Sequence, residues 1–270
     1  MRIARTTAEL RAALEPARAR SEIGLVPTMG AFHSGHLSLI EAARAENDVV
    51  VVSIFVNPAQ FGPIEDFAQY PRDEERDIRL AEEAGVDYLF VPASDEMYPD
   101  GYQTWVEAEE LSRGMEGDAR PGHFRGVATV CLKLFNIVRP TRAYFGQKDA
   151  QQAAVVERLV RDLELELELR VLPTVRDEDG VALSSRNAYL SPGEREAAQA
   201  IHRALLAGEE AHRAGAHPAA VARAVLAEEP RLQPDYVQTA RLNGRLVLAV
   251  AARCGRTRLI DNVILEGEPK

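Results

Sequence analysis

The residues best suited to chemistry are two histidines three positions apart, in the stretch His33-Ser34-Gly35-His36. An imidazole N–H can donate a hydrogen bond to the charge that grows on phosphate oxygens during phosphoryl transfer. The apolar run Ile23–Val26 precedes this stretch, and an apolar-periodic segment begins directly after it at Leu37. This order predicts a strand, a turn and a helix, and the N-terminus of a helix favours an anion. Chemistry at a nucleotide phosphate is the favoured interpretation, and two ordinary polar loop residues are the alternative.

Two glycines, Gly30 and Gly35, lie in the same loop. Because glycine has no side chain, the backbone at these positions would approach a phosphate closely. The chain lacks the Gly-Lys-Ser/Thr motif of the phosphate-binding-loop ATPases, which argues against that class of enzyme.

Two amide side chains, Asn57 and Gln60, follow the apolar run Val49–Val56. This run is apolar on both faces, as expected for a central strand of a parallel sheet. Ligands of open parallel sheets bind at the carboxyl ends of the strands, where these amides would suit the hydroxyl and carboxyl groups of a small substrate. The alternative is that Asn57-Pro58 is only a turn.

Three further polar segments contain positive charge. Gly146-Gln147-Lys148-Asp149 follows a predicted strand and opens a predicted helix, so Lys148 would neutralise phosphate charge at the same edge of the sheet. Asp149 would either accept a hydrogen bond from a ribose or adenine group or cap the helix.

Ser184-Ser185-Arg186 is either a clamp on a polyphosphate within a mobile lid or a polar surface turn. Arg120–Gly126 is a basic, glycine-rich loop that either covers the substrate or merely connects two elements.

Apolar runs alternate with helical patterns over roughly the first 170 residues, which predicts a doubly wound, Rossmann-like parallel sheet. The expected strands are Ile23–Val26, Val49–Val56, Val86–Val91, Ala143–Phe145 and Leu165–Val171, and the expected helices are Asp73–Ala84, Val127–Val138 and Gln151–Leu163.

The pattern then changes to two helices followed by three strands, which predicts a smaller C-terminal α+β domain. Ser191–Glu194 is a capping box that should begin a helix running to about Arg213, and a second helix is expected at Pro218–Glu228. The expected strands are Tyr236–Leu242, Leu246–Ala252 and Arg258–Leu265, with Asn243-Gly244 as a hairpin turn. We expect the boundary near Thr174, which divides the chain into domains 1–174 and 175–270.

The bulk properties favour a soluble enzyme of the cytoplasm. The formal net charge of -10 argues against a large nucleic-acid footprint, because such a footprint is normally basic. Cys131 and Cys254 lack metal-type spacing and are expected to be inert thiols in a reducing compartment. The segment Met1–Thr6 shows no secretory signal, and the longest apolar run, Val49–Val56, is too short to span a bilayer.

Several of these segments together resemble the pantoate–β-alanine ligase family. His33-Ser34-Gly35-His36 resembles the His-x-Gly-His signature of nucleotidylyltransferases and class I aminoacyl-tRNA synthetases, and Ser184-Ser185-Arg186 is similar to their second, Lys-Met-Ser-Lys-Ser type, loop. The segments 27–33, 57–61, 144–149 and 183–187 match the motifs of the ligase family in order, over nearly the whole chain. The resemblance implies that the pantoate carboxylate attacks the α-phosphorus of ATP, and that the β-alanine amine then displaces AMP from pantoyl adenylate.

The resemblance also implies roles for individual residues. His36, as the proton donor of the family, would act on the phosphates with His33, Lys148 and Arg186. Asn57, Gln60 and Gln152 would hold pantoate, and Gln60 would also meet β-alanine. Mg²⁺ would accompany ATP, with Asp77 as the nearest match to the metal-side carboxylate, although Arg76 stands beside it where some members have a second acid. A homodimer through the first domain is typical of the family. The implied ATP site comprises Met29, Gly30, Ala31, Phe32, His33, Ser34, Gly35, His36, Gly146, Gln147, Lys148, Asp149, Val175, Leu183, Ser184, Ser185 and Arg186.

Two other functions stay open at this point. Another nucleotidylyltransferase, which transfers AMP to a phosphate acceptor, would need more basic residues than the amides at Asn57, Gln60 and Gln152 provide. An ATP-binding module without catalysis would not need to retain both histidines and Lys148. A tRNA synthetase is disfavoured by the acidic balance and by the small C-terminal region.

Overall fold

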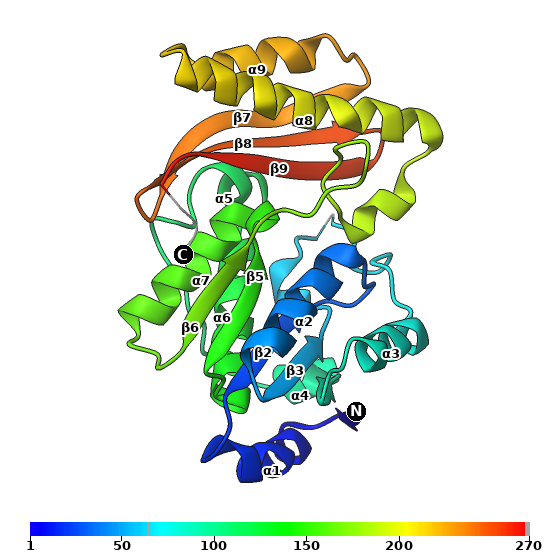
Figure 1. Ribbon diagram of the computed structural model, residues 1–270, viewed down its shortest axis with the longest axis vertical. Coiled ribbons are helices and arrows are strands. Elements are labelled where there is room, and N and C mark those ends of the chain that lie inside the picture. The colour runs from blue at the N-terminus through cyan, green and yellow to red at the C-terminus, as the bar shows by residue number, and fades with distance from the viewer. Residues whose placement is uncertain (64, 268–270) are drawn as a thin grey trace. The chain divides into compact units, whose positions relative to one another are not determined.

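The computed structural model describes residues 1–63 and 65–267, and these residues form two compact units. The first unit contains Met1–Phe145 and Val155–Leu172, and the second contains Gly146–Ala154 and the chain from Pro173 onward. Each unit has its own β-sheet with helices packed on it (Figure 1). The expected division at residue 174 is simpler than this one, because a short internal segment groups with the C-terminal unit.

In the described part of the first unit, six strands form one sheet in the order β1-β4-β3-β2-β5-β6. Parallel pairs join β1 to β4, β4 to β3, β3 to β2, and β2 to β5. The chain runs outward from β2 through β3 to β4 and then returns to the other side of β2, so a topological switch point lies beside β2. Ligands bind at such points, at the carboxyl ends of the strands. The strands are β1 (Arg2–Ala4), β2 (Ile23–Thr28), β3 (Val49–Ile54), β4 (Tyr88–Phe90), β5 (Arg142–Gly146) and β6 (Glu168–Leu172).

Helices cover both faces of this sheet, as the prediction of a doubly wound fold requires. Successive strand residues point to opposite faces, so Leu25 joins an apolar cluster with α1 and α6, whereas Val26 joins a different cluster with α2 and α3. The predicted Rossmann-like arrangement is therefore confirmed. The helices are α1 (Thr7–Arg18), α2 (Ser34–Glu46), α3 (Glu74–Glu83), α4 (Ser94–Met97), α5 (Met115–Ala119), α6 (His123–Val138) and α7 (Ala150–Asp162).

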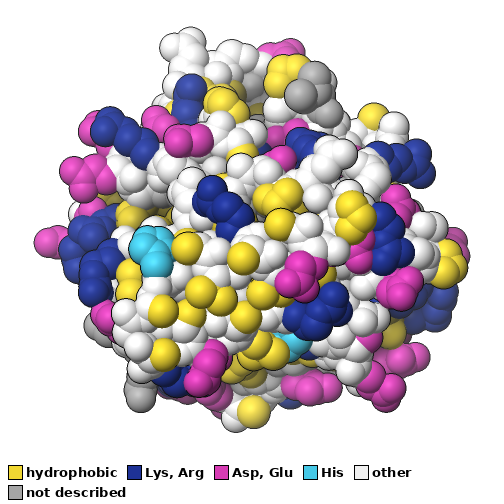
Figure 2. Space-filling model, turned by 90° about the horizontal axis from the view of Figure 1, so that it is seen from above, with side chains coloured by type: hydrophobic (Ala, Val, Ile, Leu, Met, Phe, Trp, Pro, Cys, Tyr) yellow, Lys and Arg dark blue, Asp and Glu magenta, His cyan; other side chains and the backbone are white. Residues whose placement is uncertain are grey.

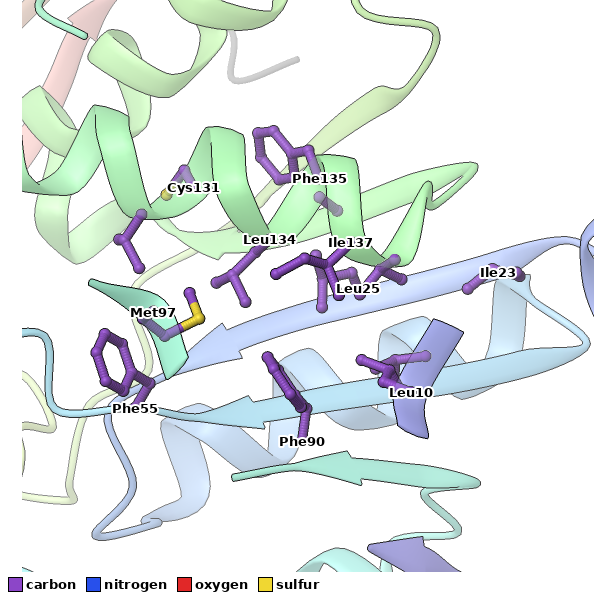
Figure 3. Close-up of a cluster of buried hydrophobic side chains, with 14 of the residues drawn as sticks. Leu10, Ile23, Leu25, Phe55, Phe90, Met97, Cys131, Leu134, Phe135 and Ile137 are labelled. Atoms are coloured by element: carbon purple, nitrogen blue, oxygen red, sulfur yellow. The ribbon is translucent and has the colours of Figure 1, made fainter. Parts of the chain in front are cut away.

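The apolar cluster beneath α6 holds the central strands in place. Figure 3 shows Leu134 and Ile137 of α6 beside Leu25 of β2, and Phe90 of β4 belongs to the same apolar cluster. Leu25 and Phe90 are fully buried, and burial of such a side chain stabilises the fold by about 1.5–3 kcal/mol. The carboxyl end of β2, which leads into the histidine segment, is thus anchored in a rigid core.

The structure differs from the sequence-based expectation at both edges of the sheet. Neither β1 nor α1 was predicted, although Thr6 and Glu9 form a capping box at the start of α1. The strand expected from Leu165 begins only at Glu168. The Leu167 amide donates to the Leu165 carbonyl at 2.8 Å and Glu164 has a φ of 52°, so the chain turns there before it joins the sheet.

In the described part of the second unit, three antiparallel strands form a sheet in the order β7-β8-β9. The predicted hairpin at Asn243-Gly244 is confirmed, and both residues have the positive φ that a type I′ turn requires. The predicted helix start is also confirmed, because Ser191 and Glu194 form the capping box of α8. The elements are α8 (Pro192–Arg213), α9 (Pro218–Ala227), β7 (Leu232–Leu242), β8 (Arg245–Cys254) and β9 (Thr257–Glu266).

Basic and acidic side chains are mixed on one face of the protein, and both thiols are buried. On the face shown in Figure 2, lysine and arginine side chains are interspersed with acidic ones, and no extended basic patch gathers there. Cys131 and Cys254 are both buried and unpaired with each other. Among the helices of residues 1–63 and 65–267, none combines the length and apolar character needed to cross a membrane.

Candidate active site

The phosphate loop, which we define as Met29–Phe32, connects the carboxyl end of β2 to the N-terminus of α2. Thr28, the buried last residue of β2, donates its hydroxyl to the Ser53 carbonyl of β3 at 2.7 Å and accepts the Gly30 amide at 3.1 Å. Gly30 and Ala31 have φ values of 81° and 53°. A left-handed backbone costs a residue with a side chain roughly 1–2 kcal/mol, so other contacts must hold Ala31 in this conformation. The neighbouring strand therefore sets where the loop leaves the sheet.

The two predicted histidines cap the helix that follows the phosphate loop. His33 is the N-cap of α2, and its Nδ1 accepts the Gly35 amide at 3.1 Å. His36 lies at the third helical position, and its Nδ1 accepts the His33 amide at 3.4 Å. The ring centroids are 4.1 Å apart. Because each Nδ1 is an acceptor, each neutral ring carries its proton on Nε2, so both rings can donate an N–H at a helix N-terminus, where an anion is stabilised.

The backbone of the phosphate loop is held by two side chains of α3. Asp77 accepts the Ala31 amide on Oδ2 at 2.7 Å and the Phe32 amide on Oδ1 at 2.8 Å. Arg76 donates Nη1 to the Phe32 carbonyl at 2.9 Å. Burial raises the pKa of Asp77, although the two amides oppose that shift. Within residues 1–63 and 65–267, no group of three or more His, Cys, Asp or Glu side chains is arranged to hold a metal; a metal role for Asp77 stays a prediction.

The predicted amide pair is buried directly after β3. Asn57 is the N-cap and Gln60 the last residue of the 3₁₀ turn Pro58–Gln60, and they are only 1% and 8% exposed. Asn57 Nδ2 donates to Gln60 Oε1 at 2.9 Å and to the Gly126 carbonyl of α6 at 3.1 Å. Gln60 Nε2 lies 3.3 Å from Met29 Sδ, so the amide pair adjoins the phosphate loop. An added Cβ at Gly126 would lie 2.3 Å from the Ala59 carbonyl, which explains why glycine occupies this position.

Two residues of the basic loop, Arg120 and His123, hold the backbone of Gln60. His123 lies 2.9 Å from the Gln60 carbonyl through Nδ1 and 3.1 Å from Arg120 Nη1 through Nε2. Arg120 can only donate, so Nε2 accepts and Nδ1–H donates to the carbonyl. Burial, and then the charge of Arg120, lower the pKa of His123 to about 4. Arg120 is paired with Glu65 at 2.6 Å. The basic loop thus supports the amide pair through the backbone of Gln60.

In the second unit, the segment Gly146–Asp149 contains the 3₁₀ turn Gln147–Asp149, which is anchored by β9. Asn262 is buried, and its Nδ2 donates to the carbonyls of Gln147 and Lys148 at 2.9 and 2.8 Å. The Gln147 side chain returns a hydrogen bond to Asn262 Oδ1 at 2.9 Å. Lys148 Nζ lies 3.7 Å from Asp149 Oδ1. Gln152 follows in the first turn of α7 and is half-buried.

The Ser184–Arg186 segment lies close to Lys148 within the same unit. Ser184 caps the 3₁₀ turn Ser185–Tyr189 by accepting the Arg186 amide at 3.3 Å. The Leu183 amide donates to the Val175 carbonyl at 3.0 Å, which brings together two segments of the predicted ATP site. Lys148 and Ser184 line one cavity of about 20 Å³. The buried Asp261 pairs with Arg176 through two contacts of 2.5 and 2.9 Å and so holds the isolated β-bridge between Arg176 and Ala182, which precedes this segment.

The structure thus brings the predicted residues together in two groups, one in each unit. The first group contains the phosphate loop, the histidines and the amide pair, and the second contains Lys148, Val175, Leu183 and the Ser184–Arg186 segment. Sequence reasoning missed the residues that support these groups. The basic loop was noted in the sequence without a supporting role for Arg120, His123 or Gly126. No local signal marks the supporting roles of the others: Arg76, Arg176, Asp261 and Asn262.

Comparison with known proteins decides the family. The family model described as Pantoate-beta-alanine ligase matches residues 2–264. The chain belongs to the pantoate–β-alanine ligase family. The pantothenate synthetase of Moorella thermoacetica is 54% identical over 280 residues, which cover 98% of this chain and 99% of the relative. That of Chloroflexus aurantiacus is 52% identical over 286 residues and all of both chains.

Solved structures of the pantoate–β-alanine ligase family have the same fold. The pantothenate synthetase of Thermus thermophilus superposes with a TM-score of 0.94 at 48% identity, over 99% of this chain and 100% of that one. The pantoate–β-alanine ligase of Francisella tularensis, complexed with β-γ ATP and β-alanine, gives a TM-score of 0.85 at 38% identity over the whole of both chains. The likeness extends over both units, so the resemblance inferred from the motifs is confirmed and the chain is an enzyme of this ligase class.

Proposed function

We propose that this chain joins pantoate to β-alanine and cleaves ATP to AMP and pyrophosphate, with pantoyl adenylate as the intermediate. One observation carries the proposal: two imidazoles share the capping box of α2, and the phosphate loop before them adjoins the buried amide of Gln60. The two imidazoles suit a triphosphate, and the Gln60 amide suits the hydroxyl and carboxylate groups of a small acid. Membership of the ligase family supports the same reaction.

In the first step, a carboxylate oxygen of pantoate forms a bond to the α-phosphorus of ATP. The bond from that phosphorus to the bridging oxygen breaks, and pyrophosphate leaves with the electron pair. Negative charge grows on the phosphate oxygens, and the Nε2–H groups of His33 and His36 are the proposed donors to that charge. Preorganised donors of this kind contribute about 10²–10³-fold each to the rate.

The acceptor side of the site would hold pantoate through amides. Gln60 and Gln152 are the proposed pantoate ligands, with Asn57 fixing the Gln60 amide through its 2.9 Å hydrogen bond. Because Asn57 Nδ2 donates to Gln60 Oε1, the Gln60 amide is held in one orientation. This orientation would place pantoate, and later the β-alanine amine, in line with the phosphorus.

In the second step, the β-alanine nitrogen forms a bond to the acyl carbon, and the bond from that carbon to the AMP oxygen breaks. The amine loses a proton, and AMP leaves with the electron pair. AMP is a far better leaving group than oxide, which is why the carboxylate must first be adenylated. Gln60 is the proposed contact for β-alanine at this stage.

The nucleotide ligands are proposed from the motifs. The phosphate loop through His36 would contact ATP, and Gly146–Asp149, Val175 and Leu183–Arg186 are the other proposed contacts. Lys148 and Arg186 supply positive charge, and two hydroxyls, of Ser184 and Ser185, supply donors. The cavity shared by Lys148 and Ser184 supports a common role for their two segments.

Mg²⁺ is proposed to arrive with the triphosphate. It is a hard cation that prefers oxygen ligands and keeps several waters. Water and the phosphate oxygens of ATP can therefore supply most of its ligands. The described residues provide no cluster of carboxylates as a cage. When bound, the ion would neutralise charge on the phosphates, and the residues named above would orient them.

The proposal predicts pyrophosphate release that depends on pantoate and AMP release that depends on β-alanine. Replacing His36 by alanine should lower kcat by about 10²–10⁴-fold. His36→Gln should be similarly impaired, because glutamine at the third helical position can preserve the capping box but lacks an imidazole. Coupled assays of pyrophosphate and AMP measure both steps.

The control is His217→Asn, at the exposed N-cap of α9, where asparagine still caps the helix. It should retain the wild-type rate. Pyrophosphate release at the same rate without pantoate would overturn the substrate assignment and favour another nucleotidylyltransferase, whereas no release under any condition would favour an inactive ATP-binding module. A near-normal rate for His36→Gln would remove the imidazole from the mechanism.

We also propose a homodimer of the cytoplasm, as is typical of the family. Light scattering during size-exclusion chromatography would measure the mass directly. A single-chain mass of 29.7 kDa at micromolar concentration would contradict the dimer.

A further inference from the structure

We propose that Asp77 is a positioning residue that, together with Arg76, sets the shape of the phosphate loop, and that it is not a ligand of Mg²⁺. The inference deepens the proposed function, since it rests on the loop being the site where phosphate binds. Three observations support it: the pairing of the carboxylate with two consecutive amides, its burial, and the close fit of Gly30 against it.

Each oxygen of the Asp77 carboxylate accepts one backbone amide of the phosphate loop. Asp77 Oδ2 accepts the Ala31 amide at 2.7 Å, and Oδ1 accepts the Phe32 amide at 2.8 Å. The two consecutive N–H groups of Ala31 and Phe32 converge on one anion within a turn in which Ala31 has a left-handed backbone. Backbones of this kind form anion-binding concavities called nests. In this chain the nest is filled by a carboxylate of the protein itself, so the left-handed conformation of Ala31 is stabilised from within.

The surroundings of Asp77 do not suit a magnesium ligand. Asp77 is only 1% exposed, whereas Mg²⁺ in proteins keeps several waters in near-ideal octahedral geometry. No second or third carboxylate, thiolate or imidazole joins it to form a metal cluster among the residues described. Arg76, the adjacent residue, presents positive charge, which would repel a divalent cation.

Gly30 packs so closely against Asp77 and Ile54 that a side chain would not fit at this position. A Cβ at Gly30 would lie 2.8 Å from Asp77 Oδ2 and 3.0 Å from Ile54 Cγ2. The absence of a side chain therefore lets the carboxylate reach the loop, in addition to letting the backbone approach a phosphate. A substitution at Gly30 would displace the carboxylate as well as strain the turn.

Arg76 holds the opposite side of the same peptide. Its Nη1 donates to the Phe32 carbonyl at 2.9 Å, while Asp77 accepts the Phe32 amide. Both side chains project from the first turn of α3, which Asp73 caps by accepting the Arg76 amide at 3.0 Å. We call Arg76 and Asp77 together the clamp. Because Phe32 immediately precedes the N-cap His33, the clamp determines where α2 begins and where the two imidazoles lie.

The test compares Asp77→Asn with Asp73→Asn by amide hydrogen exchange, without ATP and with EDTA present. An asparagine at 77 has one acceptor oxygen, so one of the two loop amides faces an NH₂ group and loses its partner. We expect exchange at Ala31 or Phe32 to become at least about tenfold faster, since local opening no longer breaks a charge-assisted bond. Asp73→Asn removes a charge from the same turn but keeps the cap, because Asn and Asp cap equally well. It should leave exchange unchanged.

The magnesium dependence of pyrophosphate release separates a positioning role from a metal role. For Asp77→Asn we expect kcat to fall about 10–100-fold, with the Mg²⁺ concentration for half-maximal rate unchanged. Unchanged exchange together with a tenfold higher requirement for Mg²⁺ would overturn the proposal in favour of a metal ligand. If Asp77→Asn does not fold, the exposed Arg76→Met variant decides: faster exchange in residues 31–34 supports the clamp, and unchanged exchange overturns it. The exchange result does not depend on pantoate, so the clamp can stand even if the proposed function fails.

Discussion

Protonation of His123 is expected to destabilise the first unit as the pH falls below neutrality. Burial, and then the charge of Arg120, lower the pKa of His123 from 6.5 to about 4. Between these values the unfolded chain takes up a proton on this imidazole while the folded unit does not. The unfolded state therefore binds more protons, and the free energy of unfolding falls as the pH falls. This contribution is fully present above about pH 6.5 and is lost as the pH approaches 4.

The magnitude follows from the lowering of the pKa. A change from 6.5 to about 4 corresponds to a loss of about 3 kcal/mol at low pH, and to about 2 kcal/mol at about pH 5. The geometry supplies the cause, because a proton on Nε2 would face Arg120 Nη1 at 3.1 Å and end the hydrogen bond between them. Burial favours the neutral acid at Glu65, but the hydrogen bonds from Arg120 hold the pKa of Glu65 below its usual value.

Trp105 provides a signal that belongs to the first unit alone. It is the single tryptophan of the chain, and it stacks on Tyr98 with 5.7 Å between ring centroids. Urea unfolding followed by its fluorescence, at about pH 7.5 and about pH 5, measures the stability of this unit. The matched variant is His123→Gln, whose amide can donate to the Gln60 carbonyl and accept from Arg120 without titrating. Wild type should lose about 2 kcal/mol more than the variant between the two pH values, and an equal loss in both proteins would refute the reasoning.

Two further predictions concern close packing and a buried ion pair. Gly126→Ala should raise the KM for pantoate at least about tenfold and destabilise the first unit by about 1–3 kcal/mol, because the new Cβ would lie 2.3 Å from the Ala59 carbonyl. Helix propensity alone would instead stabilise the protein, so a more stable variant would contradict this packing. Asp261→Asn should destabilise the second unit by about 3 kcal/mol, because it leaves Arg176 without its buried partner. Unfolding followed by circular dichroism would measure this loss, with the exposed Asp235→Asn as a surface ion-pair control expected to cost under about 1 kcal/mol.

Elements with a strong local pattern were predictable from the sequence. The helix α8 has a capping box and a long apolar face, and the hairpin at Asn243-Gly244 has a turn that few other residues can adopt. The central strands β2 and β3 were predictable because runs that are apolar on both faces occur in few other settings. The segment β1 was missed because three residues are too few to show an alternation, and α1 contains Pro16, which weakens a helical pattern.

The candidate site was predictable only as far as its motifs reach. The motifs identified the side chains that could bind substrate or take part in catalysis, because those side chains are close together in the sequence. The residues that support them are distant: Asp77 is 46 positions from Ala31, His123 is 63 from Gln60, and Asn262 is 115 from Gln147. A single sequence holds no local signal for a pairing across such distances, so these partners emerge only from the fold.

The supporting residues share one physical design. Asp77, His123 and Asn262 are each less than 9% exposed, and each hydrogen-bonds to the backbone of a short loop that carries a motif. Burial of a polar group costs free energy unless its hydrogen bonds are made, so each of them favours the one loop conformation that satisfies it. Substitution of a motif side chain should therefore change the rate and leave the loop ordered. Substitution of its buried partner should instead loosen the loop first and lower the rate as a consequence, and amide exchange measured beside kcat can separate these two effects.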